Sequence, residues 1–388
     1  MERFDDIRPY NDQEVRPVLN RLLQDQDLIS VLSQHQLPRL NDSLPGVARW
    51  LIRLGLKNKT KGVNDIEDFQ HIVEPYLTGV IESTASAISF SGLENLDPSK
   101  AYTFLSNHRD IAMDPALVNL ALHRAKRTTV RIAIGDNLLQ KPFVSDIMRL
   151  NKSFIVKRSV AGRREKLRAF QELSAYIHDS IDTGHPIWIA QSEGRAKDGN
   201  DRTDSAIIKM FHMSRKDSST TFADSICSMN IVPVSISYEL DPCDQAKARE
   251  LYETEQLGSY QKEQGEDLKS IVAGIEGSKG HIHVAFGQPL TDEYANANEV
   301  VAEVDRQIYQ EYRLTGINLA AFSRMDRGRL QGLPEIETDE LFSTLAPDEK
   351  MAEAQAAFDQ RLSECPAEYH QHLIMMYAYP VINRLSIR

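Results

Sequence analysis

The sequence has few cysteines and no long apolar run. Its three cysteines, Cys227, Cys243 and Cys365, show no CxxC spacing and cannot all pair, so we expect a reduced, cytoplasmic setting. No apolar run approaches the ~18 residues that a membrane-spanning helix needs. The first residues are acidic and polar, which predicts no signal peptide. We therefore expect any contact with a membrane to be made from one side.

The sequence also lacks the motifs of several common protein classes. It has no Walker-type loop and no dinucleotide-binding glycine pattern. His281 and His283 lie on one face of an expected strand, but no third ligand is close in sequence. We therefore expect no metal site and no cofactor. The net charge of -11 does not favour nucleic acid as a partner.

The composition is that of a globular protein large enough for a full core, with 41% hydrophobic and 26% charged residues among 388. Residues 1–89 follow helical patterns, residues 90–290 alternate strand and helix patterns, and residues 291–388 return to helices. We therefore predict an α/β domain at 90–290, with a central mixed sheet and surrounding helices, between helical N- and C-terminal regions.

Individual elements are predicted from the spacing of apolar residues. The expected strands are Tyr102–Leu105, Val130–Ile134, Phe154–Lys157, Pro186–Ala190, Ile231–Tyr238 and His281–Phe286. The expected helices of the N-terminal region are Val15–Leu32, Pro45–Leu56 and Ile66–Ala87.

The stretch Tyr102–Leu117, YTFLSNHRDIAMDPAL, has the pattern of a buried strand followed by a loop and a helix that starts near Pro115. His108 lies in the loop, with Asp110 and Asp114 within six residues of it. A carboxylate beside a histidine fixes the imidazole tautomer and stabilises the imidazolium ion, which suits general base chemistry. The alternative is that His108 is an ordinary loop residue and one aspartate merely caps the helix.

Several short blocks surround this stretch in a fixed order. They are GLENL at 92–96, SNHRDIAMD at 106–114, AIGDNL at 133–138, FIVKR at 154–158, SEGR at 192–195 and IVPVSISYE at 231–239. In their order and spacing the chain resembles the glycerolipid acyltransferase superfamily over residues 90–290. The GDNL, FIVKR and PVSISYE blocks are most similar to those of the bacterial glycerol-3-phosphate acyltransferases.

The resemblance implies a reaction and two partners. A fatty acyl group would move from acyl-CoA or acyl carrier protein to the hydroxyl of glycerol-3-phosphate, in phospholipid biosynthesis. The alternative acceptor is lysophosphatidate. No serine or cysteine lies in a nucleophile-elbow pattern, so direct attack by the acceptor hydroxyl is the simpler route. His108 would take the proton of that hydroxyl.

The resemblance also implies a set of residues that bind the acceptor. Arg158 and Arg195 would hold its phosphate, because a guanidinium group pairs with phosphate through two hydrogen bonds. Lys157 is a weaker candidate, since it can point to the opposite face of its strand. Gly194 would let the backbone approach the ligand, and Glu193 would orient Arg195 or bind the acceptor hydroxyls.

One departure from the family pattern concerns the histidine. The family places four residues between histidine and aspartate, whereas five separate His108 from Asp114 and one separates it from Asp110. We favour Asp114 as the partner and keep Asp110 as the alternative. Asp114 precedes Pro115 and is therefore a candidate N-cap. The changed spacing also leaves open a catalytically weakened module that binds lipid or a carrier protein.

The acidic chain contains one basic zone. Residues 120–168 hold 13 basic and 3 acidic residues, a local charge of +10. Such a zone suits anionic partners, so we expect peripheral attachment to the inner face of an anionic membrane. The expected helix Pro45–Leu56 combines basic and apolar residues. It could lie on lipid, or pack on the core with a solvated basic edge.

Overall fold

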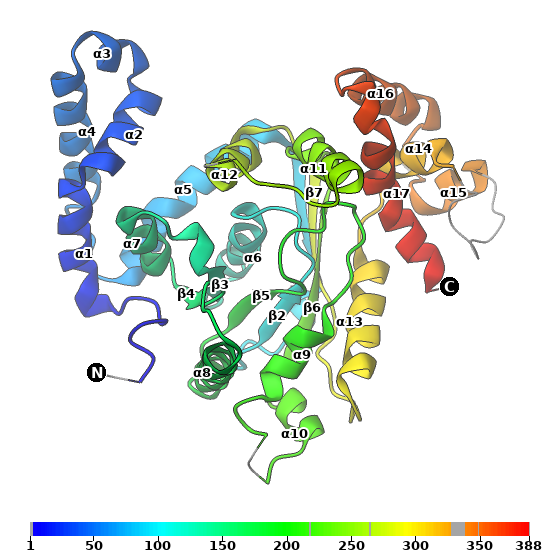
Figure 1. Ribbon diagram of the computed structural model, residues 1–388, viewed down its shortest axis with the longest axis horizontal. Helices are drawn as coiled ribbons and strands as arrows, with labels where there is room; N and C mark the ends of the chain where they lie inside the picture. Colours follow the sequence, from blue (N-terminus) through cyan, green and yellow to red (C-terminus); the bar gives the residue numbers. More distant parts are fainter. Residues whose placement is uncertain (1–2, 217–218, 264, 327–337, 348, 388) are drawn as a thin grey trace. The chain divides into compact units, whose positions relative to one another are not determined.

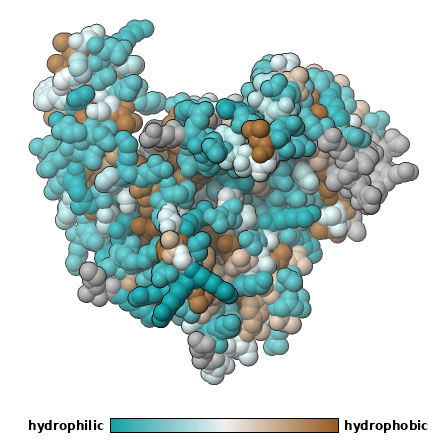
Figure 2. All heavy atoms as spheres, in the orientation of Figure 1, coloured by the Kyte–Doolittle hydropathy of each residue, from teal (hydrophilic) through white to brown (hydrophobic). Residues whose placement is uncertain are grey.

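The computed structural model describes residues 3–216, 219–263, 265–326, 338–347 and 349–387 (Figure 1). The chain divides into two compact units. The smaller unit comprises residues 1–79 and 130–176, and the larger comprises residues 80–129 and 177–388. The predicted division at residues 90 and 290 is not tested by this grouping and stays a prediction. On the face shown in Figure 2, hydrophilic side chains cover most of the surface and apolar ones form small groups.

The smaller unit begins with a series of helices. They are α1 (Asp12–Gln24), α2 (Gln26–Gln36), α3 (Pro38–Ser43), α4 (Pro45–Lys59) and the first part of α5 (Ile66–Thr84). The single helix predicted over Val15–Leu32 is wrong, because the chain breaks at Asp25. The backbone of Asp25 is extended, and its side chain caps α2 by accepting a hydrogen bond of 2.8 Å from the Leu28 N–H.

Two parallel strands complete the smaller unit. They are β3 (Arg131–Gly135) and β4 (Ser153–Val156), joined by the short helix η2 (Asp136–Leu138) and by α7 (Pro142–Leu150). Helix α8 (Arg163–Asp182) follows and leads into the larger unit. The apolar sides of α1 and α5 pack with Leu150 of α7 in one core.

The larger unit contains five strands in the order β1-β7-β6-β2-β5. Their bounds are β1 (Ala85–Ser91), β2 (Thr103–Ser106), β5 (Ile187–Ala190), β6 (Ile231–Tyr238) and β7 (Gly280–Phe286). Neighbours run parallel except β6 and β7, which are antiparallel, so the sheet is mixed. The predicted α/β fold with a mixed sheet is therefore confirmed.

Strand β1 was not predicted. Helix α5 ends at Thr84 instead of Ala87, and the residues that follow pair with β7 in parallel register, Ile88 opposite Ile282 and Phe90 opposite Val284. The apolar residues near 80–90 fit a helical and a strand spacing about equally well over so short a run. Pairing with a distant strand decides between the two spacings, and a local pattern cannot report it.

The remaining helices belong to the larger unit. They are η1 (Leu93–Asn95), α6 (Met113–Arg124), α9 (Ser205–His212), α10 (Phe222–Cys227), α11 (Asp244–Leu257), α12 (Glu266–Glu276), α13 (Ala297–Glu311), α14 (Gly316–Arg324), α15 (Thr338–Leu345), α16 (Met351–Ser363), η4 (Ala367–Tyr369) and α17 (His370–Ser386). Helices α14, α16 and α17 share a core, so the predicted helical C-terminal region is confirmed. Over the described ranges, no helix offers a stretch that could span a bilayer.

Candidate active site

The site is built at the carboxyl end of β2. This strand is fully buried between β5 and β6 and ends at Ser106. The next residue, Asn107, holds the chain to β6 through its side chain. Its amide oxygen accepts a hydrogen bond of 2.7 Å from the Ile236 N–H, and its amide nitrogen donates one of 3.0 Å to the Ile236 carbonyl. The loop that begins at residue 108 therefore starts from a fixed point.

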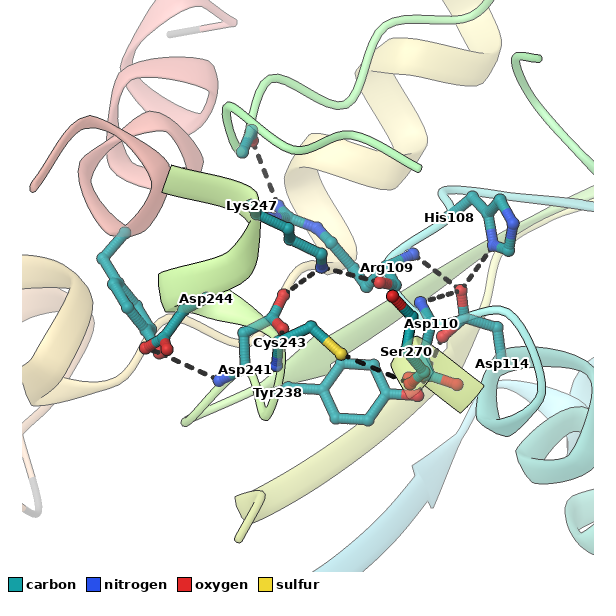
Figure 3. A network of polar contacts seen from close by, with 12 residues as sticks. His108, Arg109, Asp110, Asp114, Tyr238, Asp241, Cys243, Asp244, Lys247 and Ser270 are labelled. Atoms are coloured by element: carbon teal, nitrogen blue, oxygen red, sulfur yellow. Dashed lines mark hydrogen bonds and ion pairs between the residues drawn. The ribbon is translucent and has the colours of Figure 1, made fainter. Parts of the chain in front are cut away.

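His108 and Asp114 form a direct pair (Figure 3). Nδ1 of His108 lies 2.8 Å from Oδ2 of Asp114. The His108 side chain is 15% exposed and the Asp114 side chain is fully buried. The rings of His108 and Trp188 of β5 also pack in a T-shaped arrangement, with their centroids 5.7 Å apart. An ionised carboxylate can accept a hydrogen bond but cannot donate one, so Nδ1 of a neutral His108 carries the proton. Nε2 is then unprotonated and can act as a base.

Asp114 is held by three further donors. The backbone N–H groups of Arg109 and Asp110 donate to its Oδ2 at 2.6 and 2.9 Å, and the Tyr238 hydroxyl donates to its Oδ1 at 2.8 Å. Burial, followed by the charge of Asp114, raises the pKa of Tyr238 well above its ordinary value, so Tyr238 keeps the proton that it donates. With His108, these groups replace the water that a buried carboxylate loses.

Asp110 has a different role in the loop. Its Oδ1 accepts hydrogen bonds from the N–H groups of Ala112 and Met113, at 2.9 and 2.8 Å, just before α6 begins. Burial and the nearby charge of Asp114 raise the pKa of Asp110. The expectation that Asp114 is the N-cap is wrong: Asp114 lies within the first turn of α6, and Asp110 bonds the backbone ahead of it.

The loop after β5 is tied to the histidine loop. The Gln191 N–H donates to the Ser106 carbonyl at 2.8 Å, and the Ala196 N–H donates to the His108 carbonyl at 2.9 Å. This brings the predicted block Glu193, Gly194 and Arg195 beside His108. Gly194 has a positive φ of 86°, and nothing lies where its side chain would be.

Arg195 presents an unused donor. Its Nη1 is buried and has no hydrogen-bond partner among the residues that the structure describes. A buried donor without a partner costs roughly 1–3 kcal/mol, so such a group is expected to gain a partner when an anionic ligand binds. Glu193 is exposed on the same loop.

A buried network supports the histidine loop from behind. The side chain of Arg109 pairs with Asp201 at 2.6 Å. The Arg109 carbonyl accepts a hydrogen bond of 2.7 Å from Lys247, which also pairs with Asp241 (Figure 3). Burial lowers the pKa of Arg109, but Asp201 outweighs burial and the net shift is upward. Burial alone would raise the pKa of Asp241, but the charge of Lys247 beside it outweighs burial and holds that pKa below its ordinary value. Arg109 and Asp241 therefore stay ionised.

The two basic candidates of the FIVKR block lie in the smaller unit. Lys157 forms ion pairs with Asp6 and with Glu172, the latter at 2.9 Å. Arg158 is exposed, and its backbone N–H donates to Asp136 of the GDNL block at 3.1 Å. These contacts join the two blocks. A role for Lys157 or Arg158 in substrate binding stays a prediction.

Sequence reasoning missed the residues that support the site. Tyr238 stands at the end of the expected strand Ile231–Tyr238, inside a block that the resemblance singled out, so its position was a usable signal. Asp201 and Lys247 gave no such signal, because both are distant from Arg109 in sequence. Asp201 contacts the Arg109 side chain from 92 residues away, and Lys247 contacts the Arg109 carbonyl from 138 residues away.

Comparison with known proteins identifies one domain within the chain. The Acyltransferase family matches residues 87–237, which include β2, the His108–Asp114 pair, the Glu193–Arg195 loop and all of β6 except its last residue, Tyr238. No curated protein matches the chain. A solved structure, the 1-acyl-sn-glycerophosphate (LPA) acyltransferase PlsC from Thermotoga maritima, is 14% identical, with 74% of this chain and 94% of that chain covered and a TM-score of 0.38. At this TM-score the likeness carries no argument about the reaction. On the family match, residues 87–237 form an acyltransferase domain, and the protein is an acyltransferase.

Proposed function

We propose that the protein moves a fatty acyl group from acyl-CoA or acyl carrier protein to a hydroxyl of glycerol-3-phosphate, as a step in phospholipid biosynthesis. The observation that carries this proposal is the contact of 2.8 Å between His108 and Asp114, with Arg195 on the adjoining loop. The resemblance of the GDNL, FIVKR and PVSISYE blocks to glycerol-3-phosphate acyltransferases supports this acceptor over lysophosphatidate.

The proposed reaction needs one base and no metal or cofactor. Nε2 of His108 takes the proton of the acceptor hydroxyl as its oxygen attacks the thioester carbonyl carbon. The new C–O bond forms, the C–S bond breaks, and the departing thiolate receives the proton from the imidazolium of His108. Asp114 stabilises that imidazolium, and it holds the ring in one orientation throughout.

The phosphate of the acceptor is proposed to bind Arg195. Its guanidinium group can offer two parallel hydrogen bonds to a phosphate, and the buried Nη1 has no other partner among the described residues. The open space at Gly194 allows close approach of the acceptor, and the exposed Glu193 can accept hydrogen bonds from glycerol hydroxyls. Arg158 is retained as a second proposed phosphate ligand.

The altered histidine–aspartate spacing does not prevent the pair from forming. The five residues between His108 and Asp114, 109–113, form a turn in which the Asp110 carboxylate accepts hydrogen bonds from the Ala112 and Met113 N–H groups. Asp114 therefore still reaches Nδ1 of His108, and this geometry supports turnover over a weakened binding module.

A product assay tests the proposed acceptor and donor. Purified full-length protein is given a labelled acyl thioester, either palmitoyl-CoA or palmitoyl carrier protein, with glycerol-3-phosphate or lysophosphatidate. We expect labelled lysophosphatidate from glycerol-3-phosphate. Phosphatidate formed only from lysophosphatidate would assign the alternative acceptor, and thioester binding without either product would contradict the proposal.

A further inference from the structure

Helix α4 turns a row of apolar side chains outward. Val47, Trp50, Leu51 and Leu54 are all exposed, with Trp50 59% and Leu54 51% exposed. Residues spaced by three and four share one face of a helix, so these four form a continuous stripe, which Leu44 extends at the N-terminal end. The inward face of α4 is made by other residues, the buried Ala48 and Ile52. The stripe is therefore not the side by which α4 packs on its own unit.

The charges of α4 are all of one sign. The helix carries Arg49, Arg53, Lys57 and Lys59 and no acidic residue, in a chain whose net charge is -11. In the described part of the chain, none of these four forms an ion pair. An exposed apolar stripe flanked by unpaired cations matches an anionic lipid surface, where apolar side chains enter the acyl boundary and cations meet the headgroups.

At least four of the 13 basic residues in the zone predicted from the sequence form internal polar contacts. Arg127 donates to the carbonyls of Leu93 and Leu96, and Arg149 donates to those of Asp5 and Arg8. Lys141 and Lys157 pair with carboxylates. These side chains hold the fold together, so α4 is the better candidate for membrane contact.

We infer that the apolar stripe of α4, with its flanking cations, docks the protein on an anionic lipid bilayer. A second copy of the chain is a poorer occupant, because two stripes face to face would bring two sets of four cations together. The inference deepens the expected peripheral attachment and does not depend on the proposed reaction, since binding is measured without turnover.

Tryptophan fluorescence gives a local readout of docking. The chain has two tryptophans: Trp50 on the stripe, and Trp188, which is only 3% exposed inside the larger unit. Full-length protein is titrated with vesicles of phosphatidylcholine alone or mixed with phosphatidylglycerol. We expect a blue shift with the mixed vesicles, quenching by lipids brominated near the headgroup, and loss of both at high salt.

Variants separate the stripe from other apolar surface. Trp50→Ser combined with Leu54→Ser should weaken vesicle binding at least about tenfold by sedimentation, since ~1.4 kcal/mol is a factor of ten. Arg53→Gln combined with Lys57→Gln should weaken it and reduce its salt dependence. The matched control is Tyr76→Ser, an aromatic residue of the same unit that is 65% exposed on α5, and it should bind as the wild type does.

Three outcomes would overturn the inference. The first is absence of binding to the mixed vesicles. The second is binding that the stripe variants leave unchanged or that Tyr76→Ser weakens equally. The third is a wild-type dimer in solution, measured by light scattering, that the stripe variants convert to monomer, which would assign the stripe to a second copy. None of these outcomes alters the product assay, so failure here is distinct from failure of the proposed reaction.

Discussion

Asp110 and Asp114 are buried aspartates four residues apart, and the backbone around them gives them different roles. Asp114 faces the histidine and gathers donors from the loop and from Tyr238. Asp110 turns toward the start of α6 and bonds Ala112 and Met113. The sequence left open which aspartate partners His108, because both lie within six residues of it. Their contacts favour Asp114.

The two aspartates should respond differently to the same substitution. Asp114→Asn removes the carboxylate that holds the His108 tautomer, and we expect kcat to fall roughly 10²–10⁴-fold. Asp110→Asn should cost little, because asparagine bonds the backbone ahead of a helix about as well as aspartate does. Steady-state kcat of both variants checks the order, with circular dichroism to confirm folding. A larger loss in Asp110→Asn would reassign the partner.

The Arg195 side chain should determine acceptor affinity. Arg195→Ala removes a charge-assisted hydrogen bond worth roughly 1.5–3 kcal/mol, so the KM for glycerol-3-phosphate should rise about 10- to 150-fold. The KM for the thioester should stay near that of the wild type. Lys197→Ala is the matched control, because Lys197 lies two residues away and pairs with Glu250. If Arg195→Ala raises the thioester KM instead, Arg195 belongs to the donor site.

At the scale of elements, short apolar runs were predicted well and long-range pairing was not. Strand β6 has the predicted bounds, and β2 and β5 lie within one residue of theirs at each end, because a buried strand is a short apolar run between polar turns. Strand β1 was mistaken for the end of a helix, since only its partner β7 shows that it is a strand. Likewise, Arg109, Asp201 and Lys247 meet through the fold, so no local pattern could place them in one network.

A histidine of β7, His283, should make the free energy of unfolding depend on pH. His283 of β7 accepts or donates at both ring nitrogens, to Ser89 at 2.7 Å and to Ser91 at 3.1 Å. Burial, with the charges of Arg313 and His281, lowers the pKa of His283 from 6.5 to about 4. Because the folded pKa lies below the unfolded one, the unfolded chain binds more protons between these values. The contribution of neutral His283 to the free energy of unfolding is therefore fully present above pH 6.5 and decreases as the pH falls toward 4.

Thermal melting at a series of pH values checks this dependence. Between pH 6.5 and pH 4, the free energy of unfolding of His283→Gln should fall less than that of the wild type, by on the order of 1–2 kcal/mol. This figure allows for the partial exposure of the ring. The variant should differ in its response to pH, whatever its stability at pH 8. Equal slopes for the wild type and the variant between pH 6.5 and pH 4 would show that His283 does not titrate as described.

At the scale of the whole molecule, the family match and the site geometry concern the same part of the chain. Residues 87–237 carry the histidine, its aspartate and the Arg195 loop, and Tyr238, which donates to that aspartate, follows directly after them. The rest of the larger unit supports that part, because Lys247 of α11 holds the Arg109 carbonyl and Tyr377 of α17 donates to Asp244 of α11 at 2.8 Å. The larger unit thus joins the C-terminal helices to the histidine loop through buried polar contacts.

We propose His108, held by Asp114, as the base of acyl transfer. The most direct test is the rate of lysophosphatidate formation by the wild type and by His108→Ala, with saturating glycerol-3-phosphate and labelled palmitoyl-CoA. We expect His108→Ala to lose at least about 10²-fold in kcat, while it still binds the thioester and melts as the wild type does. A variant that is folded and turns over at a near-normal rate would contradict the claim.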